Sequence, residues 1–94
     1  MNSKSVYKIP NGKLLKISLD YDESNSTISS VKIMGDFFAY PEEAVELLEN
    51  ELKKIQLNKD ILVKKINSVI LANNIEFIGL NAEGLADGIL RCLE

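Results

Sequence analysis

The chain contains no histidine, no tryptophan and a single cysteine, Cys92. One thiol cannot form an internal disulfide or hold an iron–sulfur cluster unaided, and without imidazole the commonest zinc ligand and catalytic base are missing. Cys92 lies in an apolar-rich C-terminal segment, so we expect a small buried side chain rather than an activated nucleophile. These absences exclude a disulfide scaffold and the simplest metal and thiol chemistries.

Long apolar runs and phosphate-binding glycine motifs are absent as well. No stretch approaches the ~20 apolar residues that span a bilayer, and the start of the chain, Met1–Ser5, lacks the apolar core of a signal peptide. Neither a Walker pattern nor the spaced-glycine dinucleotide fingerprint occurs. We therefore expect a cytoplasmic protein with no membrane partner.

Positive charge is scarce overall but unevenly placed. The net charge of −3 argues against a nucleic-acid partner, because neutralising phosphates requires a basic face. Four lysines nevertheless precede the first acid, and five glutamates crowd one later segment: Lys4, Lys8, Lys13 and Lys16, then Glu42, Glu43, Glu46, Glu49 and Glu51. The lysines form either a solvated hairpin or a basic edge that faces an acidic partner, such as a nucleotide-bearing partner or an acidic protein substrate.

The 94 residues make one domain, 1–94, with a single small core. Apolar and polar residues alternate from Leu15 to Tyr21, which predicts a strand with one buried and one solvated face. Similar strands are expected at Tyr7–Ile9 and Ile28–Ile33, with Ser29-Ser30 as a bulge in the latter. Together these segments predict a three-stranded antiparallel meander.

Helical spacing dominates the second half of the chain. Pro41 suits the first helical position, and Glu42 and Glu43 suit the positive end of a helix dipole. Asparagines at 58 and 81 are candidate N-caps. The expected elements are a helix from Pro41 to about Gln56, a helix from Asn58 to Asn73-Asn74, a strand at Ile75–Gly79 and a last helix after Asn81. The fold class is thus α+β, in the order β-β-β-α-α-β-α.

The junction from Gly35 to Pro41 concentrates three aromatics within four residues, in a chain with 6% aromatic residues. Along an extended stretch, Phe37 and Phe38 point to opposite sides, so one faces away from the other. They are either ordinary core or part of a patch that completes its burial against a partner. Asp36 is expected to accept hydrogen bonds from free N–H groups near the helix start, rather than to act as a catalytic or metal-binding group. No set of residues here could run a reaction alone.

At these residues the chain resembles the accessory, C-terminal domain of lipoate–protein ligases. That family has a Gly-Lys-Leu early in a hairpin, matched by Gly12-Lys13-Leu14, and a Gly-Asp-Phe-Phe after a later strand, matched by Gly35–Phe38. A Pro-Glu-Glu helix start follows, matched from Pro41, and Gly79 loosely fits a glycine before the final helix. The similarity spans about Lys8 to Leu93. Gly-Lys-Leu is unspecific, whereas Gly-Asp-Phe-Phe leading into Pro-Glu-Glu is fairly specific.

The resemblance implies a function without catalytic residues in this chain. Ligases of this family use ATP and Mg to activate lipoate, or commonly octanoate, to lipoyl-AMP, and then transfer the acyl group to a lysine of lipoyl domains. The activating sites lie in a large catalytic domain that this chain lacks, so the chain alone binds none of these cofactors. It begins with Met1 and ends after its last helix, so it resembles the accessory domains that are separate subunits of a heterodimer. The expected interface with the large subunit comprises Lys13, Leu14, Gly35, Asp36, Phe37, Phe38, Tyr40 and Pro41.

The family fold is similar to that of sulfur-transfer and iron–sulfur scaffold proteins, whose function rests on cysteines. With Cys92 alone, and away from a scaffold loop, that function is not expected here. A second hypothesis is a stand-alone protein-binding module of the same fold in sulfur or cofactor metabolism. The two hypotheses differ in whether a catalytic ligase subunit lacking its own accessory domain accompanies the chain.

Overall fold

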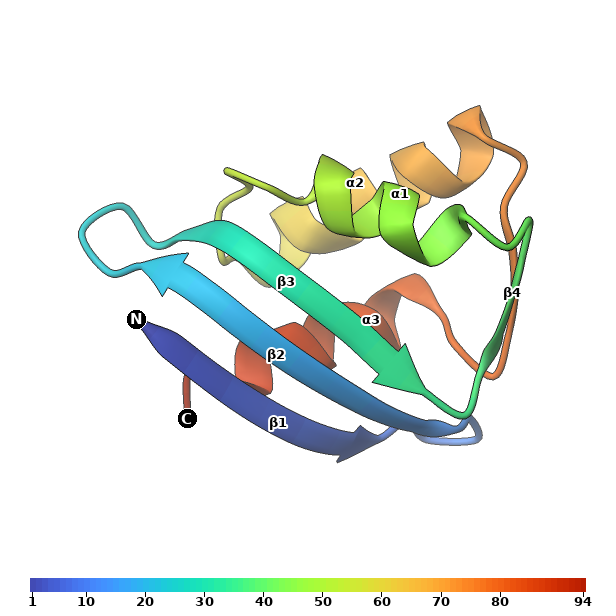
Figure 1. Cartoon of the computed structure of the whole chain (residues 1–94), viewed down its shortest axis with the longest axis horizontal. Coiled ribbons are helices and arrows are strands. Elements are labelled where there is room, and N and C mark those ends of the chain that lie inside the picture. The colour runs from blue at the N-terminus through green and yellow to red at the C-terminus, as the bar shows by residue number, and fades with distance from the viewer.

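Three long strands pair in sequence order and present one face to three helices in the computed structural model, which describes residues 1–94 (Figure 1). Two short strands form a separate antiparallel ribbon at one end of the sheet. The elements are β1 (Asn2–Lys8), β2 (Leu14–Asp22), β3 (Thr27–Gly35), β4 (Phe38–Tyr40), α1 (Ala44–Glu51), α2 (Lys59–Ala72), β5 (Glu76–Ile78) and α3 (Ala82–Arg91). The predicted α+β class and the three-stranded antiparallel meander are confirmed.

The alternation of β2 places its apolar residues on the helical side of the sheet. Leu15, Ile17 and Leu19 are buried, while Lys16 between them is exposed. Strand β3 alternates in the same way except at one point. Asp20 of β2 pairs with Ser30, but the next residue of β2, Tyr21, pairs with Ile28. Ser29 is therefore the extra residue of a bulge, at the position predicted from the break in alternation.

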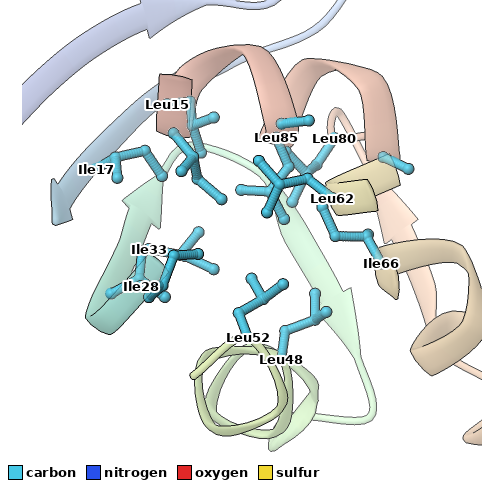
Figure 2. Close-up of a cluster of buried hydrophobic side chains, with 14 of the residues drawn as sticks. Leu15, Ile17, Ile28, Ile33, Leu48, Leu52, Leu62, Ile66, Leu80 and Leu85 are labelled. Carbon is cyan, nitrogen blue, oxygen red and sulfur yellow. The ribbon is translucent and has the colours of Figure 1, made fainter. Parts of the chain in front are cut away.

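The helices close the core over this face. Helix α3 lies behind β1 and β2, and α1 lies against β3, with α2 packed on α3 (Figure 1). Twenty buried apolar residues from all these layers meet in one cluster, part of which Figure 2 shows between Leu15, Leu48 and Leu62. No polar or charged residue is fully buried, so burial of apolar surface is the dominant stabilising term.

Both predicted asparagine caps are present. The side chain of Asn58 accepts a hydrogen bond from the N–H of Ile61 at 3.2 Å, and that of Asn81 accepts one from Gly84 at 2.6 Å. Each therefore satisfies a backbone donor that has no partner within its helix. At the far end of α2, Asn74 has φ 51°, which confirms the predicted left-handed termination.

Helix α3 approaches the sheet closely through a glycine. A Cβ atom on Gly88 would lie 2.6 Å from Cδ2 of Leu15, which is closer than real side-chain contacts. The absence of a side chain thus lets the helix backbone pack closely against the Leu15 side chain of β2.

The first helix is shorter than its sequence pattern predicts at both ends. The N–H of Ala44 donates to the carbonyl of Pro41 at 3.0 Å, so the proline belongs to a turn before α1 and is not its first residue. After Glu51, the chain leaves the helix to pair with the edge of β3. Ile28 donates to the carbonyl of Ile55 at 2.9 Å, and Lys54, with φ 69°, donates back to Ile28 at 2.7 Å. Tertiary pairing with a strand edge therefore ends the helix well before Gln56.

Of the two strands in the short ribbon, the sequence predicts β5 but not β4. Phe38 pairs with Ile78, Ala39 with Phe77 and Tyr40 with Glu76. The sequence predicted the strand near Ile75–Gly79 but not its partner, so the observed order is β-β-β-β-α-α-β-α.

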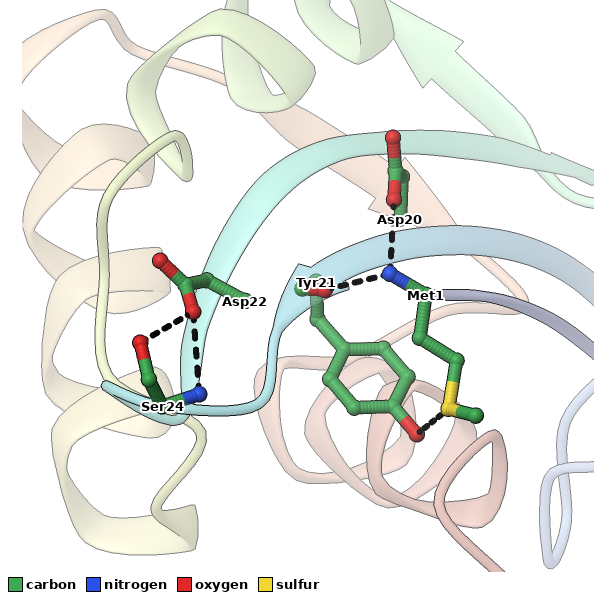
Figure 3. A network of polar contacts seen from close by, with 5 residues as sticks. All are labelled: Met1, Asp20, Tyr21, Asp22 and Ser24. Atoms are coloured by element: carbon green, nitrogen blue, oxygen red, sulfur yellow. Dashed lines mark hydrogen bonds and ion pairs between the residues drawn. The ribbon is translucent and has the colours of Figure 1, made fainter.

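At the opposite end of the sheet, the β2–β3 turn is held by polar contacts (Figure 3). The Asp22 carboxylate accepts hydrogen bonds from the N–H of Ser24 at 2.9 Å and from its hydroxyl at 2.6 Å, and these bonds lower the pKa of Asp22. The N-terminal ammonium donates to the carbonyl of Tyr21 at 2.9 Å and lies 3.5 Å from Asp20. These contacts anchor β1 along β2.

Candidate protein-interaction surface

Backbone hydrogen bonds join the sheet and the short ribbon at a corner of the molecule. The N–H of Lys13 donates to the carbonyl of Gly79 at 3.0 Å, and the N–H of Asp36 donates to the carbonyl of Leu14 at 3.1 Å. The beginning of β2 thus contacts both the segment leading into β4 and the segment leaving β5. This corner lies at the right-hand edge of Figure 1.

Gly35 makes the close approach at this corner possible. A Cβ atom at this position would collide with the carbonyl oxygen of Leu14, and backbone cannot move aside as a flexible side chain can. Because a glycine stands there, the chain can leave β3 and turn directly into β4. Close packing against the Leu14 backbone therefore explains the glycine that begins the Gly-Asp-Phe-Phe pattern.

The next two residues, Phe37 and Phe38, have opposite roles. The Phe37 ring meets the Phe77 ring edge-on, with centroids 6.1 Å apart and planes at 78°. Both rings are half-buried against the core. Phe38 points the other way and is 72% exposed. The prediction that one phenylalanine faces away from the other is confirmed.

The exposed face of the ribbon is apolar. Tyr40 follows Phe38 on the same face and is also 72% exposed, and Ile78, the cross-strand partner of Phe38, is 61% exposed. We call Phe38, Tyr40 and Ile78 the corner patch. With Ala39 and Glu76 they line a shallow hollow of about 290 Å³.

The structure brings the predicted site residues to one corner, although not all in the expected role. Lys13 is exposed, Leu14 and Pro41 are half-buried, and Phe37 supports the ribbon from beneath. The expected role of Asp36 is wrong: its side chain is exposed, caps no helix and lies well before α1 at Ala44. Sequence reasoning missed Ile78, because the alternation of Glu76, Phe77 and Ile78 does not indicate which face is covered.

The chain has no cluster of metal ligands, and its one thiol is buried. No group of three or more His, Cys, Asp or Glu side chains is arranged to hold a metal ion. Cys92 is 3% exposed, and burial raises the pKa of its thiol, which disfavours the reactive thiolate. None of the helices is both long enough and apolar enough to traverse a bilayer. The corner instead presents an apolar surface on a hydrogen-bonded ribbon.

These features define a class: a small α+β domain with an exposed apolar patch of the kind that marks protein-interaction surfaces. The chain belongs to the family of bacterial lipoate protein ligase C-terminal domains, whose model matches residues 8–89. It is therefore part of a lipoate ligase, and its role lies in lipoylation.

The solved structures support the fold. One chain superposes with a TM-score of 0.78 at 22% sequence identity, covering 95% of this chain and 94% of its own length. It comes from a study of an archaeal lipoylation system, a bi-partite lipoate protein ligase and its E2 lipoyl domain from Thermoplasma acidophilum. Comparison with curated protein sequences gave no match. Because both coverages are nearly complete, the matched chain is a domain of about the same size as this one.

Proposed function

We propose that this chain is the accessory, non-catalytic subunit of a two-chain lipoate–protein ligase. The observation that carries the proposal is the family match over residues 8–89, in a chain without a cluster of metal ligands and with its one thiol buried. The similarity to a chain from a bi-partite ligase supports a separate small subunit rather than a domain fused to the catalytic one.

The proposed complex is a cytoplasmic heterodimer in which the large subunit supplies the chemistry. It uses ATP and Mg to activate lipoate, or octanoate, to lipoyl-AMP, and then transfers the acyl group to a lysine of a lipoyl domain. Adenylation develops charge at the attacked phosphorus, and stabilising that charge requires fixed donors in a site that excludes water. A small domain that closes over the large one can complete such a site without contributing a reacting group.

We propose the corner patch as the centre of the interface with the large subunit. Aromatic side chains are enriched at the core of protein interfaces, and the Phe38 and Tyr40 side chains are both exposed on a hydrogen-bonded ribbon. The pairing of Phe37 with Phe77 beneath keeps the ribbon in place before binding, so little conformational freedom is lost on association. Lys13, Leu14, Asp36 and Pro41 belong to the segments that adjoin the ribbon, and we assign them to the rim of this interface.

The test is pyrophosphate release from ATP in a reconstituted system. Release requires lipoate, the large subunit and this chain together, and the chain alone is inactive. Transfer from preformed lipoyl-AMP to a saturating concentration of the lipoyl domain proceeds with the large subunit alone. If the large subunit alone forms lipoyl-AMP at full rate, the accessory role is wrong. If the two chains do not associate at all, the chain is a binding module for a different partner.

A further inference from the structure

The outer face of the three-stranded sheet is left uncovered, because α1 and α3 pack on the other face and α2 packs on those helices (Figure 1). Two cross-strand rows lie side by side on it, and they line a shallow groove of about 330 Å³. The rows are Val6–Lys16–Met34 and Lys4–Ser18–Lys32. We call this surface the lysine face. Its two apolar side chains, Val6 and Met34, are 64% and 54% exposed.

The positive charge of the lysine face is not neutralised within the chain. None of Lys4, Lys16 and Lys32 has a carboxylate within 4.0 Å. Asp20, an acid on the same face, lies beside the N-terminal ammonium at 3.5 Å. The crowded glutamates stand on or just before α1, on the helical side. A chain of net charge −3 therefore presents a separate basic surface on its open sheet.

The side chains of this face fit a protein surface better than a nucleic acid. Val6 and Met34 alternate with the ammonium groups, and a phosphate backbone has no apolar group to cover them. No aromatic ring lies on the lysine face to stack on a base. Tyr7 lies on the other side of the sheet, where Cζ of Arg91 is 4.9 Å from the centroid of its ring. A protein surface with carboxylates around a small apolar centre complements both features.

Lysine is also a poor residue for a permanent interface, whose core is depleted in it, because its strongly hydrated ammonium is costly to bury. Exposed charges instead steer a partner that arrives and leaves, and they raise its rate of association. In a ligase, the partner that must exchange at every turnover is the protein that accepts the acyl group. The apolar corner patch suits a lasting contact with the large subunit. The lysine face suits a brief contact with the protein that accepts the acyl group.

We propose that the lysine face receives an acidic surface of the acceptor lipoyl domain while the acyl group is transferred. The proposal rests on the proposed function, and it adds a substrate-docking role to the accessory chain. Binding through exposed ammonium groups is screened by salt, so docking weakens as ionic strength rises. The sheet thus acts as a positioning surface, and the reacting groups remain in the large subunit.

The test uses the reconstituted two-chain complex and a triple variant, Lys4→Gln, Lys16→Gln and Lys32→Gln. Lipoylation of the lipoyl domain is measured against its concentration at low and high salt. Pyrophosphate release without acceptor is measured in parallel. A matched control removes three exposed lysines on the helical side: Lys53→Gln, Lys54→Gln and Lys64→Gln. A third triple variant with arginine at positions 4, 16 and 32 keeps the charge of the lysine face.

The expected result is a rise of about tenfold in the KM for the lipoyl domain at low salt in the first variant only, as expected for losing several exposed charge pairs. The value of kcat stays within twofold, the arginine variant stays near the parent, and the difference shrinks at high salt. Equal KM values in the first variant and the helical-side control overturn the proposal. So does loss of association with the large subunit, which would make the face part of the subunit interface. A parent complex that releases no pyrophosphate refutes the proposed function instead, which separates the two failures.

Discussion

The Phe37 and Phe77 rings meet edge-on at 6.1 Å, and this contact joins the ribbon to the core while Phe38, the next residue, faces outward. Phe37 therefore stabilises the ribbon against the core, whereas Phe38 is exposed on the outer face. Phe77→Ala should lower the free energy of unfolding by about 1–3 kcal/mol, since it removes a half-buried ring and an aromatic pair. Phe38→Ala should change it by less than about 0.5 kcal/mol. Urea unfolding followed by circular dichroism measures both, and equal losses would contradict the assigned orientations.

Phe38→Asp tests the corner patch as an interface. A carboxylate at its centre has no partner on this chain and would have to be desolvated on binding, so association with the large subunit should be abolished or weakened at least about 100-fold. The isolated variant should unfold at the same urea concentration as the parent, because Phe38 is 72% exposed. Titration calorimetry measures the affinity. Leu71→Asp, at an exposed leucine of α2, is the matched control. Normal binding by the Phe38 variant would move the interface elsewhere, with the Lys13 hairpin as the next candidate.

The edge of β3 depends on a side chain from α1. The N–H of Ile33 donates to Oε2 of Glu49 at 2.8 Å, which satisfies a donor that has no strand beside it. Glu49→Ala should lower the free energy of unfolding by about 1–3 kcal/mol, the range for a buried donor that loses a charged acceptor. Glu49→Gln keeps an acceptor oxygen and should recover most of the loss. Glu46→Ala, at an exposed site on the same helix, serves as the control in urea unfolding. A Glu49→Ala variant as stable as that control would contradict this role.

Elements that rest on local signals were predictable from the sequence. The alternation from Leu15 to Tyr21 predicts its strand because each residue repeats the same choice of face. Asn58 and Asn81 act as caps because their side chains reach N–H groups only three residues away. The fold class and the clustering of the expected interface residues at one corner follow from such signals together with the family pattern.

Features that depend on distant partners were not predictable. Phe38–Tyr40 forms a strand only because Glu76–Ile78 lies beside it, and nothing within three residues specifies that pairing. The end of α1 is set by the edge of β3, not by the helical spacing that continues to Ile55. Asp36 caps no helix because strand β4, which needs β5 as its partner, and the turn at Pro41 lie between it and α1.

Cys92 should behave as a buried structural side chain. Its Sγ is 3.4 Å from the Ser5 hydroxyl, which in turn donates to the carbonyl of Gly88 at 2.8 Å, so the thiol sits where α3 meets β1. Cys92→Ser should therefore leave the activity of the complex within a few-fold of the parent. A thiol reagent should react slowly with the folded chain and rapidly in urea. Lost activity in a Cys92→Ser variant that folds normally would contradict this role.

The same thiol gives a pH dependence whose sign follows from burial. Burial raises the pKa of Cys92 in the folded chain, so the unfolded chain releases this proton at a lower pH. Between the two pKa values, the unfolded state binds fewer protons than the native state. The free energy of unfolding should therefore be unaffected by this group at neutral pH and fall from about pH 8.5 upward. Cys92→Ala removes the titrating group, so subtracting its urea-unfolding curves from those of the parent isolates the effect. A difference between parent and Cys92→Ala that stays constant from pH 7 to about pH 10 would show that the thiol is not desolvated in the folded chain.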